Sequence, residues 1–200
     1  MKNKSFLVAI TGGIGSGKSA ALKYLQSMGL QTLSCDEITR QSYDFPKIKR
    51  WLIKQFPEAV KGKIFKKVDK SLVAKIVFAD KEKLAMLTDF LTPVILEETL
   101  RQAKRLKGYV FIEVPLLFEC NKANCFDMVI VIKRAISERI ESVMSRSNLT
   151  KEQVLKRINA QFDYENADLT PYTVISNDGT EEELTQKIKA IVKDLHATLE

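Results

Sequence analysis

Residues 6–19 read FLVAITGGIGSGKS, and this stretch decides the fold class. The apolar run at 6–10 shows no polar alternation, which is typical of a strand buried on both faces of a parallel sheet. A helix is expected directly after it, because apolar residues recur with helical spacing over 22–28 and Gly29 lies where helices commonly end. The stretch therefore predicts a strand, a glycine-rich turn and a helix in immediate succession.

The glycine-rich turn matches the pattern G-x-x-x-x-G-K-S at residues 12–19. Glycines let successive backbone N–H groups curl around phosphate oxygens, and the start of the helix adds positive potential. We expect Lys18 to contact the β- and γ-phosphates of ATP, and Ser19 to offer its hydroxyl to Mg²⁺. The expected nucleotide-binding residues are Gly13, Gly15, Ser16, Gly17, Lys18, Ser19 and Ala20.

Short β-rich segments recur along the rest of the chain and are expected to form further strands. They lie at residues 31–34, 109–114, 128–132 and 173–175. Helical patterns separate them, and capping-box sequences at Thr150 and Thr180 open the last two helices. This alternation predicts an α/β fold, a doubly wound parallel sheet, in a single domain over residues 1–200.

A helical and basic segment interrupts the alternation between about residues 37 and 105. Residues 47–75 hold ten basic and two acidic side chains, although the formal net charge of the whole chain is only +7. We interpret the segment as an inserted lobe whose basic residues form either a solvated helical face or a positive wall over a polyanionic ligand. Its expected punctuation is Pro46, Pro57, Gly62 and Pro93.

Composition argues against several other classes of protein. No apolar run reaches the roughly 18 residues of a membrane span and no signal peptide is visible, so we expect a cytoplasmic monomer without membrane contact. The three cysteines lack C-x-x-C spacing and are expected to be reduced thiols. The single histidine, His196, lies in a charged helix, which excludes Ser-His catalysis and multi-histidine metal sites.

Asp36 follows the second expected strand, close to the sheet edge where open α/β folds bind ligands. Its carboxylate is suited to accept the proton of an acceptor hydroxyl. Aspartate at such a junction also commonly caps a helix N-terminus. The residue pattern by itself leaves both roles open.

Motifs along nearly the whole chain resemble those of the dephospho-CoA kinase family. Residues 113–119, EVPLLFE, resemble its D-x-P-L-L-F-E signature, with Glu113 in place of the usual Asp. Asp36 is the second Asp of a segment similar to its D-A-D-x-x-x-R, in which Ser34 and Cys35 replace the first two residues. Weaker similarities lie at 68–80, 92–95, 158–161 and 175–179, and departures at Ala20, Thr92, Pro171 and Tyr172.

The resemblance implies transfer of the ATP γ-phosphate to the ribose 3′-hydroxyl of dephospho-CoA, the final step of coenzyme A biosynthesis. Asp36 would position and deprotonate the hydroxyl, while Lys18 and Arg146 would stabilise the transferring phosphoryl group. A helical lid at about residues 136–165 would carry Arg139, Arg146 and Arg157. The acceptor-binding residues would be Arg40, Glu113, Pro115, Leu116 and Glu119.

Other interpretations stay open at this point. Arg139 and Arg157 also fit a solvated helix surface, Glu113 a satisfied structural carboxylate, and Glu119 a helix-start charge. A kinase of another small hydroxyl substrate, or a nucleotide switch without turnover, would use the same phosphate loop. A nucleic-acid-binding ATPase would use residues 47–75, but the segment shows no repeat of interleaved aromatic and basic residues, so we expect no nucleic acid partner.

Overall fold

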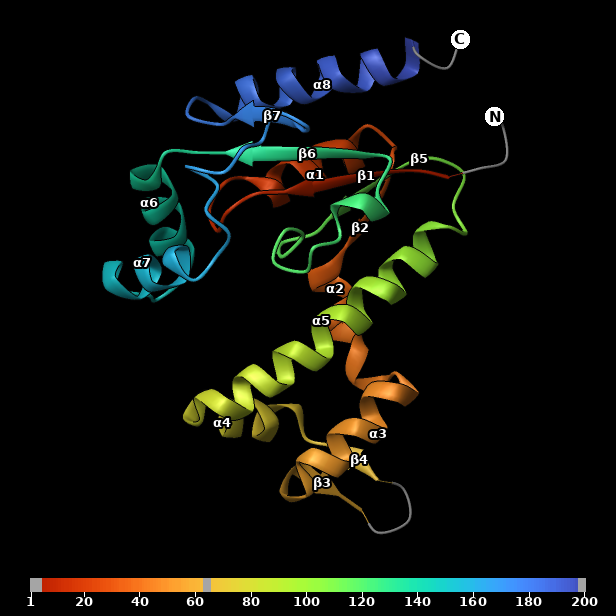
Figure 1. Cartoon of the computed structure of the whole chain (residues 1–200), viewed down its shortest axis with the longest axis vertical. Helices are drawn as coiled ribbons and strands as arrows, with labels where there is room; N and C mark the ends of the chain where they lie inside the picture. Colours follow the sequence, from red (N-terminus) through yellow and green to blue (C-terminus); the bar gives the residue numbers. More distant parts are fainter. Residues whose placement is uncertain (1–4, 63–65, 198–200) are drawn as a thin grey trace. The chain divides into compact units, whose positions relative to one another are not determined.

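A computed structural model describes residues 5–62 and 66–197, which divide into two compact units (Figure 1). The first unit combines the residues before Cys35 with those after Arg101, and the second unit is Cys35–Arg101. Residues 63–65 of the predicted basic segment lie outside the described residues. The second unit overlaps the segment predicted as an inserted lobe, whose acceptor-binding role stays a prediction.

The first unit is built on a five-stranded parallel sheet with the order β2-β5-β1-β6-β7. The predicted α/β fold with a parallel sheet is confirmed, and each expected strand lies within one residue of its predicted bounds. The strands are β1 Ser5–Thr11, β2 Gln31–Ser34, β5 Gly108–Glu113, β6 Met128–Lys133 and β7 Thr173–Ser176.

Two helices, α1 (Lys18–Ser27) and α8 (Glu181–Ala197), pack on one side of this sheet. Their apolar stripes bury the strand side chains that point toward them, as expected for amphipathic helices. The cluster comprises Val8, Ile10, Ala21, Leu25, Tyr109, Phe111, Ile130, Ile132, Ile175, Leu184, Ile188 and Val192. Side chains on the other face of β1, such as Leu7 and Ala9, are buried as well, so the strand is covered on both faces as predicted.

Local signals in the sequence account for several helix ends. Gly29 adopts φ 76°, and the N–H of Leu30 bonds to the carbonyl of Leu25, which ends α1 at the predicted glycine. The predicted capping box at Thr150 is confirmed, because its hydroxyl accepts the N–H of Gln153 at 3.3 Å and Gln153 reciprocates at 2.9 Å. Such caps satisfy backbone groups that a helix leaves unpaired at its ends.

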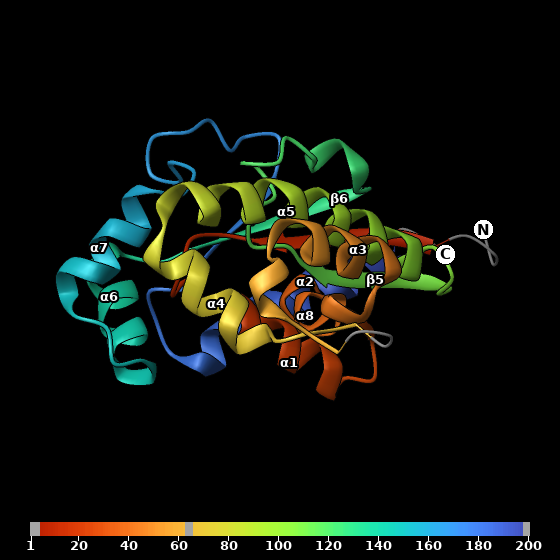
Figure 2. The same cartoon turned by 90° about the horizontal axis from the view of Figure 1, so that it is seen from below.

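Two further helices, α6 (Ile136–Arg146) and α7 (Lys151–Asn159), follow β6. In both views they lie side by side beyond the carboxyl ends of β1 and β6 (Figures 1 and 2). This is the edge of a parallel sheet at which ligands usually bind. The two helices occupy most of the segment predicted as a lid.

In its described residues, the second unit contains four α-helices and a short hairpin. They are α2 Cys35–Gln41, α3 Pro46–Gln55, α4 Lys70–Ala79, α5 Lys81–Ala103, and the strands β3 Val60–Lys61 and β4 Lys67–Val68. The α5 helix continues two residues into the first unit. The sequence did not predict the hairpin, whose strands of two residues each are too short to show a pattern.

Pro93 was expected to interrupt the chain but lies inside α5, so this expectation is wrong. A proline within a helix costs about 3 kcal/mol because it removes a hydrogen bond and crowds the preceding turn. Buried apolar contacts on both sides offset that cost, since Leu87 and Ile95 are nearly inaccessible and Phe90 stacks on Trp51 with ring centroids 4.1 Å apart.

The structure bears on the predictions about the cysteines and about membrane spans. Cys35, Cys120 and Cys125 form no disulfide in the described ranges, which agrees with the prediction of reduced thiols. Within the described ranges, the helices are all too short or too polar to cross a lipid bilayer.

Candidate active site

The turn between β1 and α1 has a backbone that only glycine fits. Gly12, Gly15 and Gly17 adopt φ values of 144°, 78° and 104°. A Cβ on Gly12 would lie 2.2 Å from the carbonyl oxygen of Ile132, and one on Gly17 would lie 2.3 Å from Nδ2 of Asn177. The glycines of the sequence motif therefore allow both the turn and the close approach of its neighbours.

Lys18 is the first residue of α1, and its side chain folds back over this turn. Its Nζ donates hydrogen bonds to the carbonyl oxygens of Gly12 at 2.7 Å and Gly13 at 3.0 Å, and the residue is only 8% exposed. A buried ammonium is stable only where such acceptors surround it. The positive charge of Lys18 is thereby held against the loop, beside the backbone groups expected to bind phosphate.

Ser16 presents an unsatisfied polar atom at the centre of the loop. The residue is 1% exposed, and its Oγ has no hydrogen-bond partner within the described part of the chain. A buried hydroxyl without a partner costs roughly 1–3 kcal/mol. A phosphate oxygen would accept its hydrogen bond, so the loop fits an anionic ligand.

Glu113 connects the end of β5 to the phosphate loop. Its carboxylate is 5% exposed and accepts hydrogen bonds from the Ser19 hydroxyl at 2.8 Å and the Ser34 hydroxyl at 3.4 Å. Because Ser19 donates its proton to Glu113, the lone pairs of its oxygen face away from the carboxylate. Hard oxygen ligands of this kind suit Mg²⁺.

A Mg²⁺ ion would depend on phosphate oxygens and water for most of its ligands. Across residues 5–62 and 66–197, no group of three or more His, Cys, Asp or Glu side chains could hold a metal by itself. Magnesium commonly binds proteins through one or two side chains and completes its coordination with substrate phosphates. The residues present therefore fit a Mg²⁺ that accompanies a nucleotide.

Arg139 of α6 lies on the same loop. Its Nε donates to the carbonyl oxygen of Ile14 at 2.9 Å, and a Cβ on Gly13 would lie 2.1 Å from its Nη2. The residue is 3% exposed, so the alternative of a solvated surface arginine is wrong. Burial lowers the pKa of the Arg139 guanidinium, and the nearby Glu165 carboxylate, 3.5 Å from Nη1, opposes that shift.

Two amide side chains from distant segments also bind the loop. Gln161, just after α7, accepts the N–H of Ile14 at 2.7 Å through its Oε1. Asn177, just after β7, donates from Nδ2 to the carbonyl oxygen of Ser16 at 2.8 Å. Both residues lie in the short pieces at 158–161 and 175–179, which were the only signal in the sequence for them.

The turn after β5 packs against the segment that follows α7. Phe118 contacts Phe162, Tyr164 and Tyr172, with ring centroids 4.6 to 5.8 Å apart. Glu119 accepts the backbone N–H of Phe162 at 2.9 Å and lies in a turn, so the interpretation as a helix-start charge is wrong. Pro115 and Leu116 are half-buried in the same turn.

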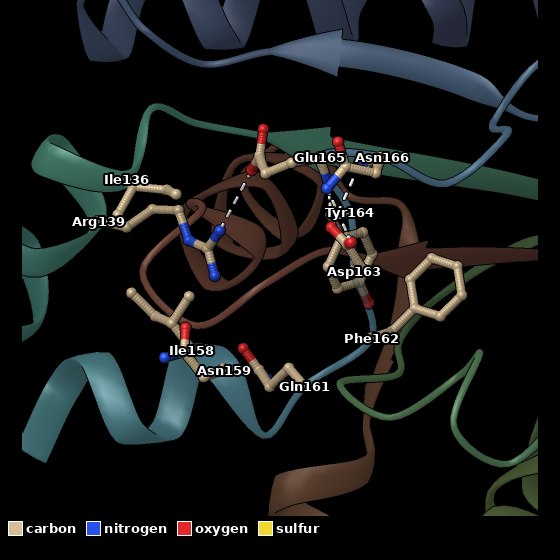
Figure 3. A pocket seen from close by; sticks show the side chains of 10 residues that line it. All are labelled: Ile136, Arg139, Ile158, Asn159, Gln161, Phe162, Asp163, Tyr164, Glu165 and Asn166. Atoms are coloured by element: carbon tan, nitrogen blue, oxygen red, sulfur yellow. Dashed lines mark hydrogen bonds and ion pairs between the residues drawn. The ribbon is translucent and has the colours of Figure 1, made fainter.

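A pocket of about 450 Å³ opens between α6, α7 and the segment that follows α7 (Figure 3). Arg139 and Gln161 point into the same space, from either side of the pocket (Figure 3). Its lining residues are Ile136, Arg139, Ile158, Asn159, Gln161, Phe162, Asp163, Tyr164, Glu165 and Asn166. Three of these residues also contact the phosphate-loop region. Arg139 and Gln161 bond to the backbone of Ile14, and the Tyr164 hydroxyl bonds to the Thr11 hydroxyl at 3.2 Å.

Comparison with known proteins decides the family. The family model for dephospho-CoA kinase matches residues 6–183. The chain belongs to the dephospho-CoA kinase family. A dephospho-CoA kinase from Thermus thermophilus is 33% identical over 190 residues, covering 94% of this chain and 91% of that one. A dephospho-CoA kinase from Thermobifida fusca is 34% identical over 200 residues, covering 96% and 97%.

Solved structures agree with this membership. The crystal structure of TT1252 from Thermus thermophilus shares 33% identity with a TM-score of 0.75, covering 96% of this chain and 98% of that one. A dephospho-CoA kinase from Campylobacter jejuni shares 26% identity with a TM-score of 0.66, covering 96% and 97%. A shikimate kinase from Acinetobacter baumannii, at 13% identity and a TM-score of 0.54, shares the fold.

Four other residues expected from the sequence lie on helices of this dephospho-CoA kinase family member and are exposed. Arg146, at the end of α6, and Arg157, on α7, are exposed, and their side chains make no hydrogen bond or ion pair with another residue of the described ranges. Asp36 and Arg40 belong to α2 in the second unit and are exposed. Asp36 lies within the first turn rather than before it, so the helix-cap alternative is wrong.

Proposed function

We propose that this member of the dephospho-CoA kinase family transfers the γ-phosphate of ATP to the ribose 3′-hydroxyl of dephospho-CoA. The phosphate loop carries this proposal, because it combines a buried, unpartnered Ser16 hydroxyl with the Lys18 ammonium at the start of a helix. Family membership supports the choice of acceptor.

Nucleotide binding would rearrange the contacts of the loop. Lys18 would exchange the carbonyl oxygens of Gly12 and Gly13 for oxygens of the β- and γ-phosphates. The Ser16 hydroxyl would donate to the same phosphates. The backbone N–H groups of the loop and of the start of α1 would do so as well, namely those of Gly13, Gly15, Gly17 and Ala20. These donors stabilise charge that shifts between oxygens during transfer.

Ser19 and Glu113 would serve the metal site. Mg²⁺ bound there would neutralise phosphate charge and hold the β- and γ-phosphates in a fixed orientation. Ser19 would be the protein ligand, and Glu113 would keep the Ser19 hydroxyl turned so that its lone pairs face the ion. Glu113 is therefore a positioning group in this proposal as well as a candidate acceptor contact.

Acceptor activation is assigned to Asp36. Its carboxylate would orient the 3′-hydroxyl and accept its proton as the oxygen attacks the γ-phosphorus, while ADP leaves from the opposite side. Arg139 and Arg146 would compensate the charge of the transferring group, and Arg157 would lie farther out on the same lid. The acceptor itself would contact Arg40, Glu113, Pro115, Leu116 and Glu119.

The proposal includes the oligomeric state, the localisation and the partners of the protein. We infer a monomer that works in the cytoplasm on the two small-molecule substrates, with neither nucleic acid nor membrane as a partner. Light scattering of the purified protein at micromolar concentration tests the monomer, and a mass of twice 22.7 kDa would contradict it.

Product analysis tests the proposed reaction. The protein is incubated with ATP, Mg²⁺ and dephospho-CoA, and phosphorus NMR assigns the position of the new phosphate. We expect ADP and a product with a monophosphate on the ribose 3′ carbon. ADP release without phosphorylated acceptor, or a phosphate at another position, would overturn the proposal.

A further inference from the structure

Ile14, at the tip of the phosphate loop, is bound in three ways to α6, α7 and the segment directly after α7. Its N–H donates to Gln161 at 2.7 Å, and its carbonyl oxygen accepts from Arg139 at 2.9 Å. Its side chain packs on the small apolar cluster that these two helices share. That cluster comprises Ile140, Val143 and Val154, with Leu149, Leu155 and Ile158 packed against it.

The loop approaches α6 so closely that its position has little freedom. A Cβ on Gly15 would lie 2.6 Å from the carbonyl oxygen of Arg139 and 3.1 Å from Cγ2 of Val143. Close-packed contacts of this kind move together rather than independently. A displacement of Ile14 would therefore be passed along the loop to Gly13 and, through Gly15, to Ser16.

Gly13 and Ser16 are among the residues expected to bind phosphate. Gly13 contributes one of the two carbonyl oxygens that hold Lys18, and Ser16, two residues beyond Ile14, carries the unpartnered hydroxyl. Phosphoryl transfer depends on placing such donors accurately, because a misplacement of about 1 Å can cost 10²-fold in rate. The contacts of Ile14 are thus in a position to affect catalysis without touching substrate.

We propose that Gln161 is a positioning residue that holds the phosphate loop through the Ile14 N–H, an inference that rests on the proposed kinase function for its rate effect. Gln161 provides the only acceptor for this N–H among the residues that the structure describes. Its side chain makes no second hydrogen bond there, unlike Arg139, which also pairs with Glu165. The side chain of Gln161 is neutral, so its effect on the loop is separable from direct charge stabilisation.

Three substitutions test the rate effect on the full-length protein. Gln161→Leu removes the acceptor, Gln161→Glu keeps an oxygen acceptor of the same length, and Gln186→Leu makes the same change on the exposed face of α8. We expect kcat of Gln161→Leu to fall at least about tenfold, equivalent to about 1.4 kcal/mol, while KM for ATP changes less than about threefold. Gln161→Glu should keep the hydrogen bond to Ile14 although it adds a negative charge, and Gln186→Leu should match the unsubstituted protein in kcat.

A second measurement tests the contact without any acceptor substrate. Isoleucine is labelled with ¹⁵N, and the Ile14 amide is followed by hydrogen exchange and by its proton shift. In Gln161→Leu this amide should exchange faster and move upfield as the hydrogen bond is lost, whereas other isoleucine amides should not change. If Gln161→Leu does not fold, the unbranched Gln161→Met carries both measurements.

The outcomes separate this inference from the proposed function. An unchanged Ile14 amide, or an unchanged kcat in folded Gln161→Leu, would overturn the positioning role. An Ile14 amide that exchanges equally fast in Gln161→Leu and Gln161→Glu would also overturn it. A protein that phosphorylates no dephospho-CoA but shows the predicted amide change would contradict the proposed function and leave the loop contact in place.

Discussion

The phosphate loop and the helical unit Cys35–Arg101 are built in opposite ways. In the loop, a Cβ added to Gly12, Gly13, Gly15 or Gly17 would collide with a neighbouring atom at 2.8 Å or less. In the helical unit, ion pairs such as Lys47–Glu97 at 3.7 Å lie at the surface, and Phe78 is 77% exposed. The loop therefore leaves no room for added side-chain atoms at these glycines, whereas we expect the exposed surface of the helical unit to tolerate substitution except where a side chain takes part in the reaction.

Removing the charge at the loop should have the largest effect. We expect Lys18→Ala to abolish detectable phosphoryl transfer, since Lys18 is the cation assigned to the β- and γ-phosphates. The fold should persist, because the side chain bonds to a ligand-binding loop rather than filling the core. Turnover and circular dichroism are measured on the same preparation, and near-normal turnover in a folded variant would contradict the assignment.

Asp36 is the one residue of the helical unit to which we assign a catalytic role, so its substitution should have a large effect. Asp36→Asn keeps the size of the side chain but removes the proton acceptor, so kcat should fall roughly 10² to 10⁴-fold with little change in ATP affinity. Steady-state kinetics and nucleotide binding measure the two quantities. If kcat holds and only the melting temperature drops, Asp36 has a structural role and the helical unit contributes no catalytic group at this position.

Two glycines with similar backbone angles sharpen the contrast in stability. Gly17 at φ 104° lies against Asn177, whereas a Cβ added to Gly29, at φ 76°, would lie more than 4 Å from all other described residues except its two neighbours in the chain. Gly29→Ala should cost about 1–2 kcal/mol from the left-handed backbone alone. Gly17→Ala should cost more, because the clash adds to the same strain. Urea unfolding compares them, and equal losses would show that the loop relaxes around the new methyl group.

Tyr164 provides a pH-dependent effect of intermediate size. Burial raises its pKa from 10.0 to about 12, so its neutral form is favoured in the folded protein. Its contribution to stability is fully present below pH 10 and is lost as pH rises toward 12, because the unfolded chain ionises first. Tyr164→Phe should lack this loss, which unfolding curves between pH 9 and 11 would detect. Parallel curves for both proteins would contradict the assignment.

The smallest effect is expected on the helical surface. Lys47→Ala breaks an ion pair whose two side chains are 61% and 77% exposed. Such pairs commonly contribute between about 0 and 1 kcal/mol. The melting temperature should barely change, and a loss comparable to that of Gly17→Ala would show that this surface is more tightly organised than its exposure indicates.

The sequence predicted those features of the fold that depend on neighbouring residues. The buried strand before the loop, the glycine at the end of α1 and the capping box at Thr150 are each set within a few positions of the chain. The β3–β4 hairpin and the continuation of α5 through Pro93 were not predicted. In the second case tertiary packing outweighs a local preference, which no local pattern reveals.

The candidate site was predicted only in part for the same reason. Lys18 and Ser19 follow from a contiguous motif, whereas Gln161 and Asn177 reach the loop across 147 and 161 positions of sequence. Arg139 is charged and lies on an amphipathic helix, so its sequence fitted a surface residue as well as a buried one. Its burial results from the packing of α6 on Gly15, which the sequence of α6 does not reveal.

The choice of acceptor tests the central claim most directly. Dephospho-CoA carries a pyrophosphate and a pantetheine arm that AMP lacks, and binding energy from these remote groups is available to orient the 3′-hydroxyl. Initial rates of ADP release with each acceptor give kcat/KM under identical conditions. We predict a value at least about 10²-fold higher for dephospho-CoA than for AMP, which about 2.7 kcal/mol of differential binding would provide. Comparable efficiency with AMP, adenosine or shikimate would contradict the proposed substrate.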